Sequence, residues 1–529
     1  MTLVIFLAAL IGGMLIGLPI CFALLFSGVC MMLYLNGFNA QILSQNLFSG
    51  ADSFSMMAVP FFIMAGEFMN RGGITKRIVN AANAIIGHVR GGLGYVAIMA
   101  ILLFASMIGS AVASTAFLGA ILIPMMVRAG YKRDTCTGLI AAGNILSPIM
   151  PPSVPMIIFG VQAGVSVTKL FMGGIAPAVY LSGALCVLWF FIAKKDNLAK
   201  AERQSAKQVA KALLDGLWAL ILPVFILVGL RSGKFTPTEA GVIAAVYALV
   251  IGLFVYKELK ISMLMECLVS AAKSSSVIMF LAAAAMVSSW MMTVANVPSI
   301  VTGILAPFIE HPVALMLIIC LIVLLVGTSM DVTPTIMILT PVLLPAVKAA
   351  GIDVAYFGVV FILMTVLGLL TPPVGTVLNV ACGAGKINME RMVKSIWPFL
   401  LAEVVILLLM VLFYFSVPLI VRYYLGEQYY DCIRLLKVMA PMIFLVPASI
   451  IMSNYILLPF GYRKYFSYIP VITAFMHFFY AFYLSKNYGA YGACIAILLT
   501  ELISFMILLV VNLKLHTFKY IFGFEYEPR

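Results

Sequence analysis

Residues 109–115 read Gly109-Ser110-Ala111-Val112-Ala113-Ser114-Thr115 and interrupt an otherwise apolar stretch with small and hydroxyl-bearing side chains. A second interruption follows and reads Ser147-Pro148-Ile149-Met150-Pro151-Pro152-Ser153-Val154-Pro155. In a lipid bilayer, a broken helix leaves backbone N–H and C=O groups unpaired, which is tolerated only where protein, water or an ion satisfies them. Both interruptions are therefore candidate ion or substrate sites.

The composition around these stretches is that of an all-α polytopic membrane protein. Of the 529 residues, 64% are hydrophobic and only 10% are charged, far too apolar for a soluble globular protein. Apolar runs of about 20 residues, the length that spans a bilayer as a helix, recur at 2–35, 92–108, 171–193, 216–230, 240–256, 314–326 and 392–415. A β-barrel is disfavoured, because its strands would alternate polar and apolar residues.

The formal net charge of +13 does not indicate a nucleic-acid partner. The Lys and Arg residues stand at the ends of apolar segments, where they anchor and orient helices in the bilayer. Their densest group lies in the connector 194–215, which we therefore expect in the cytoplasm. The nine cysteines are scattered without CxxC spacing, and the chain has no HExxH, GxSxG or GxxxxGK[ST] pattern. We therefore predict neither an enzyme nor a metal site built on cysteine or histidine.

The chain contains an internal repeat at a constant offset of 221 residues. The offset superposes Pro124 on Pro345, Gly130 on Gly351, Pro151-Pro152 on Pro372-Pro373, Gly164 on Gly385 and Pro177 on Pro398. Pro19 aligns with Pro237 at a slightly different offset of 218. Paired interrupted segments in two halves of a chain point to a transporter binding site at the membrane midplane.

Each repeat is predicted to hold a re-entrant hairpin and a broken helix. The hairpins lie near 106–127 and 327–347, and the broken helices at 138–163 and 354–383. The second copy has its own polar tip, residues 327–335, and its own break, residues 368–376. We expect a first half at 1–193, the connector 194–215, a second half at 216–412 and a tail of about three helices at 413–529. The tail holds 15 of the 22 tyrosines.

One carboxylate, Glu67, lies inside a short apolar segment. An acid within the membrane is costly and is a functional candidate. Alternatively, Glu67 reaches the membrane interface or pairs with Arg71, Lys76 or Arg77. The sequence leaves these possibilities open.

Four motifs together resemble the large membrane subunit of the tripartite ATP-independent periplasmic (TRAP) transporters, over residues 1–412. They are Gly109-Ser110-Ala111-Val112-Ala113, Gly233-Lys234-Phe235-Thr236-Pro237-Thr238-Glu239-Ala240-Gly241, Met330-Asp331-Val332-Thr333-Pro334-Thr335 and Leu370-Thr371-Pro372-Pro373-Val374-Gly375. Within the family, the chain most resembles importers of sugar acids or keto acids such as sialic acid and diketogulonate.

The resemblance implies a fold, an ion and two partners. The fold is an inverted-repeat, elevator-type transporter in the bacterial inner membrane, with sodium held by hairpin tips and helix breaks. The partners are a soluble periplasmic substrate-binding protein and a small four-helix membrane subunit. Some members carry the small subunit fused at the N-terminus, and we expect no such fusion here because the sequence begins with the large subunit's first span.

The sodium ligands follow from the position of each tip and break. Sodium prefers oxygen ligands, which broken-helix carbonyls and Ser or Thr hydroxyls supply. The residues predicted for one site are Ser106, Gly109, Ser110, Ser147 and Pro148, and for its repeat mate Gly327, Thr328, Asp331, Thr333, Gly368 and Thr371. Asp331 could instead cap a helix N-terminus.

The substrate carboxylate is predicted at the half-helix N-termini that follow Pro152 and Pro373. The residues expected to assist are Ser114, Thr115, Asn144, Ser153, Gly375 and Thr376. Each of these small residues could instead serve helix packing or backbone hydrogen bonding.

The tail departs from the family pattern. Residues 425–429 and the spans after them are similar to the C-terminal part of polysaccharide flippases, which predicts a seam between two unrelated proteins near residues 412–418. Three helices are only a fragment of a flippase, so we expect no flipping of lipid-linked sugars.

The leading hypothesis is sodium-driven uptake of an organic anion, either a sugar acid, a keto acid or a dicarboxylate, delivered by a binding protein. The alternatives are a stand-alone sodium/carboxylate symporter and a fusion whose tail prevents assembly.

Overall fold

The computed structural model describes residues 2–198, 204–372, 374–420 and 462–515, together with residues 435, 439, 442–450, 452–453 and 457. All regular secondary structure in these residues is helical, as the sequence predicts. Seven helices of the described part are long and apolar enough to cross a membrane, and several shorter apolar helices accompany them. The chain forms two compact units, Met1–Leu407 and Leu408–Arg529.

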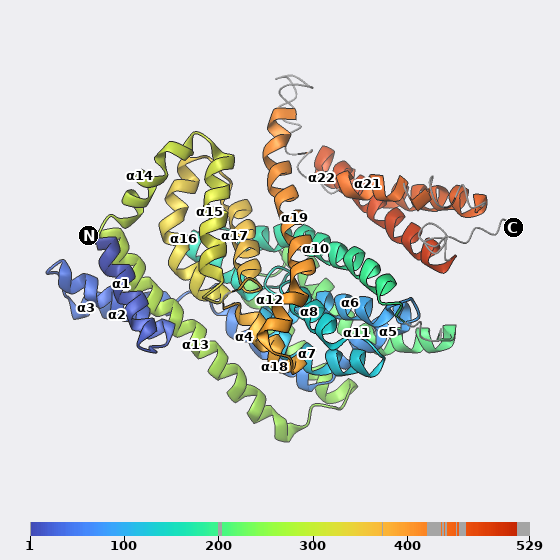
Figure 1. The fold of residues 1–529 in the computed structure, drawn as a ribbon, viewed down its shortest axis with the longest axis horizontal. Helices are drawn as coiled ribbons and strands as arrows, with labels where there is room; N and C mark the ends of the chain where they lie inside the picture. Colours follow the sequence, from blue (N-terminus) through green and yellow to red (C-terminus); the bar gives the residue numbers. More distant parts are fainter. Residues whose placement is uncertain are drawn as a thin grey trace. The chain divides into compact units, whose positions relative to one another are not determined.

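The first half of the larger unit runs from α1 to α10 (Figure 1). Its helices are α1 (Thr2–Leu15), α2 (Ile20–Tyr34), α3 (Ala40–Ala51), α4 (Ala58–Arg71), α5 (Ile74–Ile86), α6 (Gly92–Ile108), α7 (Ala111–Arg128), α8 (Arg133–Asn144), α9 (Val154–Ala163) and α10 (Val167–Lys195).

The second half runs from α11 to α19. Its elements are α11 (Ala206–Arg231), α12 (Pro237–Val250), the π-helix η1 (Ile251–Val255), α13 (Ile261–Val294), α14 (Val297–Ile309), α15 (Pro312–Gly327), α16 (Val332–Ala349), α17 (Val354–Gly368), α18 (Thr376–Gly385) and α19 (Met389–Ile420). Figure 1 shows α15, α16 and α17 side by side, and each packs on the other two.

The 221-residue offset of the sequence is also present in the helix boundaries. Both α7 and α16 have 18 residues, and both their first and their last residues are 221 positions apart. Pro124 and Pro345 lie inside these helices. Gly130 and Gly351, which follow the helix ends, have φ values of 87° and 67°. This left-handed conformation is one that glycine adopts at little cost, so the same residue ends both helices.

Both predicted broken helices are present as pairs of shorter helices. In the first repeat, α8 ends at Asn144 and α9 begins at Val154, with the proline-rich run between them. In the second repeat, α17 ends at Gly368 and α18 begins at Thr376. The prolines lack the N–H that a continuous helix needs, which explains why both helices stop there.

The two repeats exchange equivalent contacts. Helix α7 packs on α18, and its counterpart α16 packs on α9; α8 packs on α18, and its counterpart α17 packs on α9. Outside the hairpins, α2 packs on α13, while α12 packs on α4. Equivalent helices of the two repeats therefore make equivalent contacts with the other repeat. The repeat found in the sequence is thus also a repeat of packing.

The smaller unit contains α21 (Met442–Ile450) and α22 (Arg463–Lys514), whose backbone departs from helical geometry at Gly489. The buried residues Met452, Leu457, Ile469 and Leu508 form a small core. Helix α19 runs without a break through residue 412, where the sequence suggests a change of composition. Most of the Tyr-rich connector and residues 516–529 lie outside the described residues.

Candidate functional site

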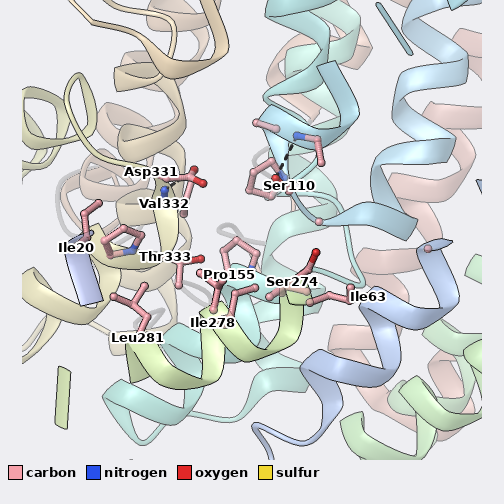
Figure 2. A pocket seen from close by; sticks show the side chains of 18 of the residues that line it. Ile20, Ile63, Ser110, Pro155, Ser274, Ile278, Leu281, Asp331, Val332 and Thr333 are labelled. Carbon is pink, nitrogen blue, oxygen red and sulfur yellow. Dashed lines mark hydrogen bonds between the residues drawn. The ribbon is translucent and has the colours of Figure 1, made fainter. Parts of the chain in front are cut away.

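Both hairpin tips line one pocket of about 460 Å³. Its lining residues from the tips and the first break are Gly109, Ser110, Ala111, Ala113, Pro148, Val154, Pro155, Asp331, Val332, Thr333 and Pro334. In Figure 2, Asp331, Val332 and Thr333 lie at the left of the pocket, and Ser110 lies at the right. The volume lies within the range of small-molecule sites. The structure therefore joins segments that are 221 residues apart in the chain.

Helices outside the hairpins form the rest of the wall. They are the start of α2, one face of α4 and the middle of α13. Their lining residues are Pro19, Ile20, Cys21, Ile63, Gly66, Glu67, Asn70, Ser274, Val277, Ile278 and Leu281. Apart from Glu67, none of these residues carries a signal in the sequence that marks it as part of a site.

The first tip packs against the first break. Gly109 has a φ of 66°, and a Cβ added to it would lie 3.0 Å from the backbone N of Val154, at the start of α9. Ser147 and Pro148 belong to the break that precedes α9, and both are buried. Pro148 also lines the pocket. The structure thus brings Gly109, Ser110 and Pro148 to one place. The side chain of Ser106 lies outside the described residues.

The second tip packs even more closely on the second break. A Cβ on Gly368 would lie 2.6 Å from the carbonyl carbon of Gly327, and a Cβ on Gly327 would lie 2.7 Å from the carbonyl oxygen of Thr365. The backbone N–H of Gly375 donates to the carbonyl oxygen of Thr328 at 3.0 Å. The second tip and the second break therefore meet through their backbones. The predicted residues that make this contact are Gly327, Thr328, Gly368 and Gly375. Pro373 lies outside the described residues.

Ser110 and Asp331 have the same structural role in the two tips. The hydroxyl of Ser110 accepts a hydrogen bond from the N–H of Ala113 at 3.3 Å, and Asp331 Oδ1 accepts one from the N–H of Val332 at 2.8 Å. Each residue is the N-cap of its helix, so the capping role that the sequence allows for Asp331 is present. Both residues also line the pocket, so capping and lining occur together.

Comparison with known proteins identifies the family. Residues 7–415 match the family model of the tripartite ATP-independent periplasmic transporter, DctM component. The chain belongs to the TRAP transporter large permeases. A Haemophilus influenzae protein named as a candidate TRAP large permease is 50% identical over 408 residues, which cover 77% of this chain and 96% of that protein. The resemblance stated from the four sequence motifs is therefore confirmed.

A second relative and one solved structure extend the comparison. The Escherichia coli 2,3-diketo-L-gulonate TRAP transporter large permease YiaN is 48% identical over 80% of this chain and 98% of its own length. The crystal structure of the Alcanivorax borkumensis YdaH transporter matches with a TM-score of 0.53 at 14% identity, covering 70% of this chain and 86% of that one. This second likeness concerns the fold alone. The family match ends at residue 415, so the flippase resemblance of the tail stays a prediction.

The residues predicted to assist substrate binding in this permease are not among those that line the described pocket. The hydroxyls of Ser114 and Thr115 donate to the carbonyl oxygen of Ala111 at 3.2 and 2.7 Å. The Ser153 hydroxyl donates to the carbonyl oxygen of Pro148 at 2.5 Å and caps α9. These three side chains have the backbone-bonding role that the sequence left as the alternative.

Asn144 and Thr376 have unused hydrogen-bonding capacity. Asn144 is fully buried; its amide donates to the carbonyl oxygen of Ile140 at 2.7 Å, while its Oδ1 has no partner in the structure. The buried Thr376 hydroxyl oxygen also has none. Neither residue is among those that line the described pocket, and neither is Ser114, Thr115, Ser153 or Gly375.

Glu67 lies in the pocket wall, bonded to a serine. Its Oε1 accepts a hydrogen bond from the Ser270 hydroxyl at 2.7 Å, which joins α4 to α13. Arg71 pairs with Glu266, and Arg77 pairs with Glu258 at 2.8 Å. Both arginines therefore bond carboxylates other than Glu67. Their pairing with Glu67, one of the possibilities left open by the sequence, is not what the structure shows.

Proposed function

We propose that this TRAP permease couples the entry of sodium to the uptake of an organic anion, which a periplasmic binding protein delivers. The observation that carries the proposal is the pocket at which the two tips meet. Ser110 and Asp331 place a hydroxyl and a carboxylate there, and a broken helix such as the adjoining first break can offer backbone carbonyls as well. These are oxygen ligands, which suit a small hard cation.

The charge of the pocket also supports a coupling cation. Its lining residues include two carboxylates, Glu67 and Asp331, and none of the described lining residues is Lys, Arg or His. An anion that enters such a pocket alone meets like charge in a partly dehydrated space, which is unfavourable. Bound sodium offsets this repulsion, so the anion binds well only after the cation. Such an order of binding couples the two fluxes.

The repeat supports an elevator mechanism with inverted repeats. The tips and broken helices of α6–α9 and α15–α18 pack on one another through reciprocal contacts, whereas α2, α4 and α13 form the opposite wall. We propose that the hairpin segments move as one body past this wall and carry sodium and anion with them. The reciprocal contacts fit two repeats of opposite orientation, as in other transporters built this way.

The proposed assignment keeps one sodium site at each tip and its adjoining break. We propose Gly109, Ser110, Ser147 and Pro148, with Ser106, for the first sodium site. For the second we propose Gly327, Thr328, Asp331, Thr333, Gly368 and Thr371. Sodium bound at these tips, together with the N-terminal ends of α9 and α18, would attract the substrate carboxylate. A small membrane subunit and a binding protein complete the system.

Reconstitution tests the proposal. Proteoliposomes containing this chain and its small subunit are supplied with loaded binding protein, with or without an inward sodium gradient. We expect uptake only with the gradient, and equal uptake in the two conditions would contradict the proposal. Uptake without binding protein would favour a stand-alone symporter instead.

The same assay examines the tail. A variant that ends at Val417 separates two hypotheses. Unchanged uptake means that the tail is passive, and uptake restored by truncation means that the tail prevents assembly.

A further inference from the structure

The pocket wall formed by α4 carries two polar side chains. Glu67 and Asn70 lie one turn apart on α4, and both line the pocket. The Oδ1 atom of Asn70 has no hydrogen-bond partner in the structure. In Figure 2, Ile63, which precedes Glu67 on α4 by one turn, lies at the right of the pocket, while Asp331 lies at the left.

The hydrogen bond of Glu67 leaves most of its capacity unused. An ionised carboxylate accepts about four hydrogen bonds through two oxygens and donates none. The structure gives Glu67 one bond, from the Ser270 hydroxyl at 2.7 Å. The neighbouring Arg71 pairs with Glu266, which lies outside the pocket lining. The unused acceptor positions of Glu67 therefore face no Lys, Arg or His among the described residues that line the pocket.

Such a wall distinguishes between the two ends of a substrate. Hydroxyl groups donate hydrogen bonds, and a carboxylate accepts strong, charge-assisted bonds from them. A second carboxylate on the substrate would instead lie against the Glu67 carboxylate without a cation between them. The resulting repulsion disfavours such a substrate. The wall thus accepts an uncharged, hydroxyl-bearing end and rejects a charged one.

We propose that Glu67 and Asn70 form a specificity wall that selects polyhydroxylated monocarboxylates, the sugar acids, over dicarboxylates. This inference rests on the proposed function, because the sodium ions at the hairpin tips hold the single carboxylate of the substrate. The hydroxylated end of the substrate then faces α4, where Glu67 accepts its hydrogen bonds beside the side chain of Asn70. Ser270 fixes the orientation of the Glu67 carboxylate.

A native cysteine in the pocket provides a readout that requires neither transport nor the binding protein. Cys21 lines the pocket and is partly exposed. A variant that keeps Cys21 and replaces the other eight cysteines, purified with the small subunit in saturating sodium, is alkylated by a maleimide. The rate of alkylation is measured against increasing D-gluconate, a hydroxylated monocarboxylate, and against increasing succinate, a dicarboxylate.

We expect gluconate to slow alkylation at concentrations at least roughly tenfold below those of succinate. The decisive substitution is Glu67→Gln, which retains an oxygen to accept the Ser270 bond and removes the charge. It should raise the half-protecting gluconate concentration roughly tenfold and lower that of succinate. The matched control is Glu390→Gln, which removes an exposed carboxylate outside the pocket lining and should leave both concentrations unchanged.

Asn70→Ala is a second variant, with a smaller expected loss of gluconate protection of roughly threefold. Elution as a single folded species and an unchanged alkylation rate without ligand establish that each variant is intact. If Glu67→Gln does not fold, Asn70→Ala and the preference of the parent protein still decide the question.

The possible failures are distinguishable. If gluconate and succinate protect the parent protein equally in sodium, the specificity wall is wrong and the proposed function stands. If neither ligand protects Cys21, neither binds in this pocket and the specificity wall is overturned, while the reconstitution assay still decides the proposed function. If Glu67→Gln weakens both ligands equally and raises the sodium requirement, Glu67 is a cation ligand and the specificity wall is overturned.

Discussion

The two hairpin tips have the same helix-capping arrangement and differ in one charged group. Ser110 and Asp331 occupy equivalent positions, each caps the helix that follows, and each lines the same pocket. The first tip offers a neutral hydroxyl, whereas the second offers a carboxylate. The repeat therefore sets where the oxygens are placed, and under the proposed function the individual residue would set how strongly a cation is held. We expect two unequal sites, of which the second depends more on its cation.

The largest expected effect comes from closing the space at the second break. In Gly368→Ala, the new Cβ would lie 2.6 Å from the Gly327 backbone, and neither backbone segment can yield easily. Such overpacking costs on the order of 1–3 kcal/mol or more. We expect most sodium-driven uptake to be lost and the unfolding temperature to fall.

Gly109→Ala is the comparison at the first break. Its backbone is left-handed, and the new Cβ would lie 3.0 Å from the backbone N of Val154. We therefore expect the free energy of unfolding to fall by a smaller amount, about 1–2 kcal/mol. Thermal unfolding of the two purified variants checks the order. If Gly109→Ala proves the more damaging, the tighter packing assigned to the second tip is wrong.

A large effect on sodium affinity is expected from Asp331→Asn. Asparagine still accepts the Val332 N–H bond, so the helix cap remains while the charge is lost. The difference between a charged and a neutral oxygen ligand corresponds to roughly tenfold in the sodium concentration for half-maximal uptake. Sodium titration of uptake measures it, and an unchanged half-saturation would count against a cation at the second tip.

A smaller effect is expected from Ser110→Ala at the first tip. This variant loses the cap to Ala113 N and one neutral oxygen of the pocket. The lost cap lowers stability by typically about 1 kcal/mol, whereas the loss of one neutral oxygen ligand, worth about 0.5–1 kcal/mol, corresponds to roughly twofold to fivefold in sodium half-saturation. The same titration provides the comparison. A Ser110→Ala effect larger than that of Asp331→Asn would reverse the proposed inequality.

The smallest effect is expected from Ser114→Ala. Its hydroxyl is buried, bonds the Ala111 carbonyl within its own helix, and is absent from the pocket lining. We expect uptake rates and sodium dependence to change by less than about twofold, because such intrahelical hydroxyl bonds contribute little. A strong loss of uptake would mean that Ser114 reaches the substrate in another conformation.

Much of this architecture is predictable from the sequence because proline, glycine and capping residues act locally. The alignment of Pro124 with Pro345 predicts the matching helices α7 and α16, and the proline runs predict both breaks. Local rules such as these act through a few neighbouring backbone groups, so one sequence suffices to read them.

The remainder of the site depends on contacts between distant segments. Cys21, Asn70 and Ser274 line the pocket because α2, α4 and α13 pack around the tips, and no local pattern in these helices marks the pocket-lining residues. The intramembrane acid Glu67 could be singled out, but its partner Ser270 is 203 residues away and is not marked by any motif. The sequence also could not show that the hydroxyls of Ser114 and Thr115 bond a carbonyl oxygen of their own helix.

The central claim is that two unequal tips hold sodium at one pocket. Equilibrium binding of radioactive ²²Na⁺ to the purified protein tests it without requiring transport. The account predicts that Asp331→Asn lowers sodium affinity roughly tenfold and Ser110→Ala lowers it less. Sodium binding that is the same in the parent protein and in both variants would contradict the account.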